Sequence, residues 1–225
     1  PQGDATLEKA VYGLYARADI VHPDGATGVV YKAGEQVATL TTDKNGQASV
    51  DGLYLGNYYV KEITPPTGYL ADEEEHDLVC NYEGDFVAEV KRDCLSLEQV
   101  MKQPFEIIKA ANNGKTDADL LKGAGFTAYL VSSLTVKEDG SYDFGSAKPV
   151  VIGENGATEM FTDEKGYACS IALPYGTYIV RETTTPHNYT PVDDFTVRIT
   201  ENNPNQPQTW RVLLDDEFEA KLKII

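Results

Sequence analysis

The side chains most often used in catalysis are scattered through this chain. The three histidines, His22, His76 and His187, lie far apart in the sequence, and no Ser or Cys stands in a setting typical of a nucleophile. A catalytic triad needs a nucleophile, a histidine and an acid in contact, so we interpret these histidines as isolated surface residues. The sequence therefore predicts a protein that is not an enzyme.

The three cysteines, Cys80, Cys94 and Cys169, form no CxxC motif and no Cys/His pair at the spacing of a zinc site. Cys80 and Cys94 are close enough in the sequence for a disulfide, but their spacing does not require one. Buried free thiols are the simpler interpretation. We predict no metal site and no cofactor.

The carboxylates admit two further interpretations. Asp43 and Glu62 are candidates for the paired acids of a hydrolase, and the run Asp72–Glu75 for weak cation binding. Asp43 and Asp163, however, open the motifs DKNG and DEKG, which are typical of type I turns with Asp first and Gly last. A calcium loop would need further oxygen ligands and a closing Glu. We favour turns at both Asp residues and a solvated loop at the acidic run.

The composition indicates a folded protein of one or two domains. The 225 residues carry a formal net charge of −17, and 41% of them are hydrophobic. Phosphate backbones and anionic lipid surfaces repel such an acidic chain, which argues against nucleic acid as a partner. No apolar run approaches the roughly 20 residues of a membrane span, and the first ten residues lack the regions of a signal peptide. We expect the chain to be either cytosolic or a piece of a longer secreted protein.

The strongest pattern in the sequence is an internal repeat. The blocks AVYGLYA, TTDKNGQASV and GLYLGNYYVKEITPPTGY of the first half recur in the same order as AGFTAYL, FTDEKGYACSI and ALPYGTYIVRETTTPHNY. Matched residues lie 120 positions apart, as in Asp43 and Asp163, Gly46 and Gly166, Gly56 and Gly176, Glu62 and Glu182, and Tyr69 and Tyr189. This constant register predicts two copies of one fold.

The repeated blocks predict β-strands. Residues 58–63 and 178–183 alternate in the manner of a half-buried strand, and prolines follow both segments. The one candidate helix is Ser96–Lys102, whose alternation also fits a strand. Many short strands between turn signals predict an all-β protein of two antiparallel β-sandwiches, with a junction near Gln103-Pro104.

The blocks together resemble the SpaA/CnaB family, the prealbumin-like sandwich modules of Gram-positive surface proteins and pilins. The first half carries AVYGLY, TDKNG and LYLGNYYVKEITPPTGY, and the second carries AGFTAY, TDEKG and LPYGTYIVRETTTPHNY. The resemblance covers most of the chain and departs at His187-Asn188, where the family usually has a Gly before the Tyr. It implies two tandem prealbumin-like, Ig-like sandwiches of the CnaB type.

The resemblance also implies where the domains begin. Family modules open with a strand that carries a lysine, and PFEIIKA, which contains Lys109, matches it. We therefore expect domain 1 over residues 1–103, lacking its first strand, and domain 2 over residues 104–225. The segment Asp216–Ile225 resembles PFEIIKA and is expected to open a further module of a longer chain.

Many family members form an isopeptide bond between that lysine and an Asn or Asp of the last strand, beside a Glu or Asp. In domain 2, Lys109 matches the nucleophile and Glu182 the proton shuttle, and burial would favour the neutral amine and the protonated acid. Asp215 is the expected acceptor because it follows the apolar run Val212–Leu214, although Asp216 stands beside it. By analogy with a disulfide, such a bond stabilises by about 4–5 kcal/mol. The alternative is a strand-end lysine, a locally bonded Glu182 and a surface Asp215. In domain 1 the lysine strand is missing, so we expect no bond there.

The resemblance implies a structural stalk or spacer of a Gram-positive cell-surface adhesin or pilus-like protein. The expected partners are neighbouring modules of the same chain, and we expect a monomer at the cell surface or cell wall, with no membrane insertion of this fragment. The alternative is a ligand-binding adhesin module. Exposed tyrosines would then recognise a carbohydrate or a host matrix protein, with Tyr54, Tyr58 and Tyr175 as candidates.

Overall fold

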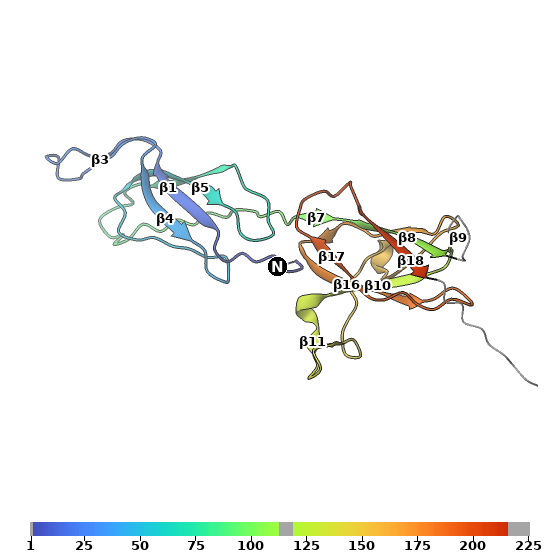
Figure 1. The fold of residues 1–225 in the computed structure, drawn as a ribbon. Helices are drawn as coiled ribbons and strands as arrows, with labels where there is room; N and C mark the ends of the chain where they lie inside the picture. The colour runs from blue at the N-terminus through green and yellow to red at the C-terminus, as the bar shows by residue number, and fades with distance from the viewer. Residues whose placement is uncertain (1, 113–118, 216–225) are drawn as a thin grey trace, which may run out of the picture. The chain divides into compact units, whose positions relative to one another are not determined.

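The computed structural model describes the backbone of residues 2–112 and 119–215, and the side chains of these ranges except at 112 and 211–215. The chain divides into two compact units (Figure 1). Unit 1 comprises Ala5–Val100, and unit 2 comprises Gln2–Asp4 and the chain from Met101 onward. The residue-level division at 103/104 stays a prediction.

Unit 1 contains a four-stranded antiparallel sheet with the order β4-β1-β5-β6. Its long central strand β5 buries Tyr58, Val60 and Glu62 on one face, because alternate residues of a strand point the same way. Between β1 and β4 in the chain, β2 and β3 pair as a small two-stranded ribbon. The strands are β1 (Val11–Ala16), β2 (Ile20–Val21), β3 (Val29–Tyr31), β4 (Gln36–Thr41), β5 (Gly56–Thr64) and β6 (Glu75–Cys80).

Unit 2 repeats this sheet as β13-β10-β16-β17. The register is also repeated: Tyr12 of β1 pairs with Glu62 of β5, and Phe126 of β10 pairs with Glu182 of β16. The same strand pairing therefore recurs in both copies, although Tyr12 and Phe126 are 114 positions apart and the glutamates are 120 apart. These strands are β10 (Gly125–Leu130), β13 (Glu159–Phe161), β16 (Gly176–Thr184) and β17 (Phe195–Ile199).

Unit 2 also has a second sheet, in which β8 lies between β14 and β18 and β9 pairs with β8. The pairing of β8 with β18 is parallel, whereas β14 pairs with β8 in the antiparallel sense. The parallel pair is an exception within a fold that the sequence predicted as antiparallel. These strands are β8 (Phe105–Asn112), β9 (Asp119–Leu120), β14 (Tyr167–Cys169) and β18 (Gln208–Asp215).

The remaining elements of unit 2 are short. Strand β7 pairs with β15 and β11 with β12. The helical prediction for residues 96–102 is wrong, because Lys102 belongs to β7 and the preceding residues form no regular helix. No described helix is long or apolar enough to cross a membrane. The elements are β7 (Lys102–Gln103), β11 (Thr135–Val136), β12 (Tyr142–Asp143), β15 (Leu173–Pro174) and the 3₁₀ turns η1 (Val131–Ser133) and η2 (Glu154–Gly156).

The two units differ in the size of their cores. The core of unit 2 contains thirteen buried side chains, which come from both of its sheets. The main core of unit 1 contains five: Leu14, Ala16, Ile20, Tyr58 and Val60. Apolar area removed from water is the main stabilising term in folding, so unit 2 is the more strongly stabilised unit.

The predicted turns are present in both units. The Asp43 carbonyl accepts a hydrogen bond from the Gly46 amide, and Asp163 accepts one from Gly166 in the same way. Each carboxylate caps the turn by accepting amide bonds from the residues that follow. Both glycines have positive φ, which explains their recurrence. The turn interpretation of these Asp residues therefore agrees with the structure.

Candidate functional site

The core of unit 2 contains a buried ion pair that joins its two sheets. Lys109 lies on β8 of one sheet and Glu182 on β16 of the other, and Nζ of Lys109 is 2.8 Å from Oε2 of Glu182. Both side chains are fully buried. Removing one partner of such a pair leaves a buried charge uncompensated and typically costs 3–5 kcal/mol. The two residues predicted as nucleophile and proton shuttle are thus in contact.

Backbone contacts fix both residues of the pair. The Lys109 amide donates to the Gly166 carbonyl at 2.7 Å, and the Lys109 carbonyl accepts from the Leu121 amide at 3.0 Å. Glu182 Oε2 also accepts the Val192 amide at 2.8 Å. Its other oxygen, Oε1, is buried and has no hydrogen-bond partner among the described residues. One acceptor in this site is therefore open to a further donor.

The register of β18 determines where the predicted acceptor lies. Val212 is the residue opposite Lys109, and Asp215 is opposite Asn112. Asp215 therefore lies three positions further along the strand, a rise of roughly 10 Å. Its side chain, like the whole of Asp216, lies outside the described residues. The role of Asp215 stays a prediction.

Unit 1 contains the counterpart of Glu182 without a lysine. Glu62 is 8% exposed, and its Oε2 accepts the Asp72 amide at 2.6 Å, ten residues along the chain as in unit 2. Its Oε1 is buried and has no partner among the described residues. No described basic side chain forms an ion pair with it. The same carboxylate site thus exists in both units, but only unit 2 supplies the cation.

A polar cluster surrounds Glu62 in place of the lysine. The Tyr12 hydroxyl donates to Oε1 of Glu98 at 2.6 Å, and the Ser96 hydroxyl donates to Oδ2 of Asp72 at 2.8 Å. Oε2 of Glu98 is another buried oxygen without a described partner. His76 lies 3.0 Å from the same Asp72 oxygen. Two carboxylates with unpartnered oxygens therefore share one partly buried site.

The environment shifts the pKa values of this cluster in opposite directions. Burial raises the pKa of Glu62 above its usual range, and the neighbouring Glu98 and Asp72 charges raise it further. Burial also acts to raise the pKa of Asp72, but hydrogen bonds from the Glu74 amide, His76 and Ser96 lower it overall. Burial and the bond to Glu98 raise the pKa of the Tyr12 hydroxyl.

Sequence reasoning identified Glu62 but missed Tyr12, Ser96 and Glu98 as its neighbours. Tyr12 and Glu98 are 86 residues apart. The one available signal was the repeat, which places Phe126 at the register position of Tyr12. A hydroxyl in one copy and none in the other indicates a different polar environment around the matched glutamate.

The other candidate residues do not gather into a site. His22 contacts Asp24 and His76 contacts Asp72. Asp43 uses its carboxylate to cap its own turn, which leaves the hydrolase pair of Asp43 and Glu62 without support. The described side chains form no group of three His, Cys, Asp or Glu residues arranged to hold a metal ion.

The cysteine and tyrosine interpretations need correction. All three cysteines are free, but Cys94 and Cys169 are exposed, so the prediction of buried thiols is wrong for these two. Tyr58 is 1% exposed and belongs to the core, because its alternation places it on the inner face of β5. Tyr54 and Tyr175 are half-buried.

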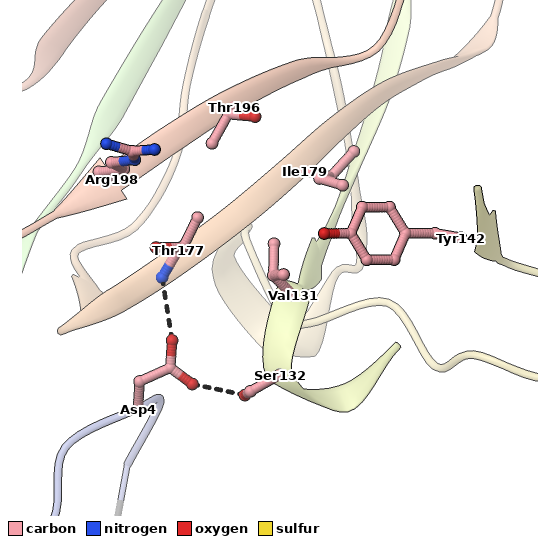
Figure 2. A pocket seen from close by; sticks show the side chains of 8 residues that line it. All are labelled: Asp4, Val131, Ser132, Tyr142, Thr177, Ile179, Thr196 and Arg198. Atoms are coloured by element: carbon pink, nitrogen blue, oxygen red, sulfur yellow. Dashed lines mark hydrogen bonds between the residues drawn. The ribbon is translucent and has the colours of Figure 1, made fainter. Parts of the chain in front are cut away.

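A shallow pocket of unit 2 lies beside β16 (Figure 2). Asp4 accepts the Thr177 amide and the Ser132 hydroxyl, and these contacts form one side of the pocket. Polar and apolar residues line the rest, and the described lining contains no second acid and no histidine. The lining residues are Asp4, Val131, Ser132, Tyr142, Thr177, Ile179, Thr196 and Arg198.

Several solved structures are similar to this chain. The Bacillus anthracis TIE protein is similar over 92% of this chain and 30% of its own length, with 21% identity and a TM-score of 0.54. The minor pilin GBS52 of Streptococcus agalactiae matches over 97% of this chain and 86% of its own, with 17% identity and a TM-score of 0.39. The shaft pilin SpaA from Lactobacillus rhamnosus GG matches over 96% and 90%, with 17% identity and a TM-score of 0.34.

The chain thus spans less than a third of the TIE protein, and that likeness supports the fold alone. No curated protein matches the chain. The profile of the SpaA prealbumin-like fold domain matches twice in tandem, over residues 2–93 and 104–211. These matches confirm the predicted resemblance and the fold class of two tandem prealbumin-like β-sandwiches. The chain belongs to the family of SpaA prealbumin-like fold domains, of which it contains two.

Proposed function

We propose that this chain is a load-bearing module pair, a stalk or spacer of a Gram-positive cell-surface adhesin or pilus-like protein, and not an enzyme. The observation that carries the proposal is the pairing of β8 with β18 in unit 2. These strands, the first and last long strands of the unit, run parallel over eight residue pairs (Figure 1).

The direction of this pairing determines how the unit responds to tension. Force transmitted along the chain pulls β8 from its amino end and β18 from its carboxyl end. Parallel strands pulled in this way slide past each other, so their hydrogen bonds are loaded together. Strands of a hairpin, pulled from the same end, separate one bond at a time. The pairing in unit 2 therefore favours resistance to extension.

The buried ion pair adds to this resistance. Lys109 lies on β8, and its bond to Glu182 connects β8 with the opposite sheet. Phe105 and Ile107 of the same strand are fully buried in the core. Sliding of β8 would expose these apolar side chains and separate a buried ion pair, both of which cost free energy.

We further propose that Lys109 forms an isopeptide bond with Asp215, as the family resemblance implies. Glu182 takes a proton from Lys109, and the neutral amine attacks the side-chain carbonyl carbon of Asp215. An amide bond forms, the carbon–oxygen bond of the carboxyl group breaks, and one water leaves with the proton that Glu182 returns. The buried Oε1 of Glu182, which has no hydrogen-bond partner among the described side chains, supports this role, since it can hold the acceptor carboxyl by a hydrogen bond.

Intact mass under reducing conditions, followed by peptide mapping, tests the bond. The expected result is the loss of one water, mapped to a branched peptide that joins Lys109 to Asp215 and is absent from the Glu182→Ala variant. The exposed Glu164→Ala variant is the control and retains the loss. An unmodified mass would rule out the crosslink. Hydrogen bonds and the ion pair alone would then hold β8 in place. A branch at Asp216 would relocate the acceptor.

The proposed partners are neighbouring modules, and the proposed location is the cell surface or cell wall. Sedimentation of the purified chain at increasing concentration tests the expected monomer.

A second function, recognition of a carbohydrate or host matrix protein, is favoured only by the shallow pocket of unit 2, where Tyr142 and Arg198 offer a ring and a donor group. A glycan and matrix-protein array with the Arg198→Ala variant tests it. Binding that this change removes would support recognition.

A further inference from the structure

Two shallow hollows of unit 2 meet at the side chains of Tyr142 and Ile179. The hollow shown in Figure 2 has a volume of about 420 Å³. A second hollow, with a volume of about 610 Å³, is also lined by Tyr142 and Ile179. The two hollows therefore form one groove, and Tyr142 separates its two halves.

The floor of the groove is built by β16 and β17. Their antiparallel pairing places Thr177 beside Arg198 and Ile179 beside Thr196. The residues that alternate with these on both strands are buried in the core, so the groove lies on the opposite face of the sheet. Ile179 is nevertheless only 9% exposed, because the chain that contains Tyr142 lies over it (Figure 2).

Aromatic contacts hold the wall of the groove in place. Tyr142 belongs to β12, and its ring extends toward Ile179 (Figure 2). Phe144 packs edge-to-face with Tyr129 and with Tyr142, at centroid distances of 5.1 and 6.4 Å. The Arg181 guanidinium lies 4.0 Å from the centroid of the Phe144 ring. Tyr142 is thus a positioned ring, and a positioned ring costs less conformational entropy when a ligand binds.

The charges that line the groove balance, but their hydrogen bonding does not. The lining contains three basic and three acidic side chains: Lys137, Arg181, Arg198, Asp4, Asp143 and Asp194. Each acid already accepts a hydrogen bond from a backbone amide or a guanidinium group of unit 2. The side chains of Lys137 and Arg198 form no hydrogen bond or ion pair with any described residue. The groove therefore offers unused donors, while its carboxylates are occupied.

This lining favours a neutral ligand that has an apolar face and many acceptors. An anion would be opposed by the three carboxylates and by the net charge of −17, and a cation would find no free carboxylate. A peptide strand adds to the edge of a sheet, whereas this groove lies on the face of β16 and β17. A sugar ring combines a face of C–H groups, which packs on an aromatic ring, with oxygens that accept hydrogen bonds.

We infer that the groove binds a neutral oligosaccharide, with one sugar ring packed on each side of Tyr142. Lys137 donates to the sugar oxygens in one half of the groove, and Arg198 donates to those in the other half. The inference rests on carbohydrate recognition, the second function proposed above, and adds the ligand class and the two subsites. Because the groove is shallow, we expect a dissociation constant on the order of 1 mM for a short chain.

NMR of the isotope-labelled, intact 225-residue chain tests the inference. The probes are maltotetraose, cellotetraose, N-acetylchitotetraose and lacto-N-tetraose, each compared with its component monosaccharides. We expect at least one tetrasaccharide to shift the amides of Thr177 and Gly145, one in each half, with a single dissociation constant. Its affinity should exceed that of its monosaccharides about tenfold, because both subsites are filled.

Substitutions separate the ring from the donors. Tyr142→Ala should weaken binding of that tetrasaccharide about tenfold, whereas Tyr142→Phe, which keeps the ring, should retain it. Lys137→Ala and Arg198→Ala should each weaken it as well. Tyr82→Ala, which removes an exposed ring from unit 1, is the control and should bind like the wild type. If Tyr142→Ala does not fold, the variants at the exposed Lys137 and Arg198 still decide the question.

Three results would overturn the inference. Shifts confined to one half of the groove, or equal affinity for a tetrasaccharide and its monosaccharides, would exclude two subsites. Absence of saturable shifts with every probe, or tighter binding of the acidic hyaluronan tetrasaccharide, would exclude a neutral oligosaccharide as the ligand. Binding of a matrix protein that Arg198→Ala removes, without binding of any oligosaccharide, would overturn this inference and leave the proposed recognition function standing.

Discussion

The environments of Glu62 in unit 1 and Glu182 in unit 2 differ although their backbone positions match. Each glutamate lies on the long central strand of its sheet and accepts an amide ten residues further along the chain. In unit 2 a lysine from a second sheet completes the site, and in unit 1 a tyrosine hydroxyl, a serine and two more carboxylates surround the glutamate. The comparison shows that in unit 2 a single strand, β8, provides both buried apolar side chains of the core and the cation that pairs with the buried glutamate.

The comparison also separates what the sheet provides from what the inserted strand provides. Sheet order and register are the same in both units, so they do not depend on β8. The second sheet, the larger core and the ion pair occur only where β8 is present. Substitutions that remove contacts of β8 should therefore affect unit 2 strongly and have little effect at the matching positions of unit 1.

The largest loss of stability is expected for Lys109→Ala. The change leaves Glu182 buried without its cation, so unit 2 should lose about 3–5 kcal/mol of unfolding free energy. The single tryptophan, Trp210, packs against Phe195 in unit 2 and reports its urea unfolding by fluorescence. Lys122→Ala, which breaks an exposed ion pair, is the control and should cost at most about 1 kcal/mol. Equal losses for the two variants would contradict the structural role of the pair.

The next largest difference in stability is expected between two matched substitutions, Ala168→Leu and Ala48→Leu. Ala168 of β14 is packed in the core beside β8, so a larger side chain should cost about 1–3 kcal/mol. Ala48 is exposed, and its substitution should stay within about 0.5 kcal/mol. Calorimetric scans of both variants measure the shifts. A large loss at Ala48 would show that this residue is packed in unit 1 as Ala168 is in unit 2.

The stability of unit 1 should depend on pH because of Glu62. Burial raises the pKa of Glu62 above its ordinary value of 4.5, so the folded state binds more protons than the unfolded state above that pH. Stability from this residue is therefore greatest below pH 4.5 and falls as pH rises through the folded pKa, by at most about 1.4 kcal/mol per pH unit.

The Glu62→Gln variant should lack this slope. The lowered pKa of Asp72 acts in the opposite sense, but below its ordinary value of 3.8, outside this range. Urea unfolding of unit 1, followed by hydrogen exchange between pH 4.5 and 7, measures the difference. Parallel pH profiles of variant and wild type would exclude Glu62 as the source.

The smallest effect is expected for Tyr12→Phe, which gives unit 1 the side chain that unit 2 has at the same register position. Glu98 loses the hydrogen bond from the tyrosine hydroxyl, so unit 1 should lose about 1 kcal/mol. The melting temperature of unit 1 measures this loss. No change would show that water replaces the hydroxyl without cost.

Much of the fold followed from local patterns in the sequence. The repeat, the Asp–Gly turns and the prolines after β5 and β16 identified both copies, because each depends on residues close together in the chain. The inner face of β5 was not predicted: in YYVKEI, apolar residues occupy both alternating sets, and the assignment of Tyr58 to the surface was wrong.

The candidate site was less accessible to sequence reasoning. Lys109 and Glu182 are 73 residues apart, and only the family resemblance brought them together. The cluster around Glu62 depends on Glu98, which lies on the inward side of residues 96–100, where burial alternates although the polar Ser96 and Glu98 occupy inward positions. The register of β18 is set by parallel pairing with β8, which the apolar run before Asp215 does not specify. Contacts between distant segments therefore had to come from the structure.

Single-molecule stretching of the whole chain tests the central claim most directly. The account predicts two unequal events: unit 1 extends at low force because no terminal strands of its described fold are clamped in parallel, and unit 2 resists to a much higher force. With the Lys109–Asp215 bond formed, the residues between these positions should contribute no extension at all. Release of both units at similar low force, with full extension of each, would contradict a load-bearing role for the β8–β18 pair.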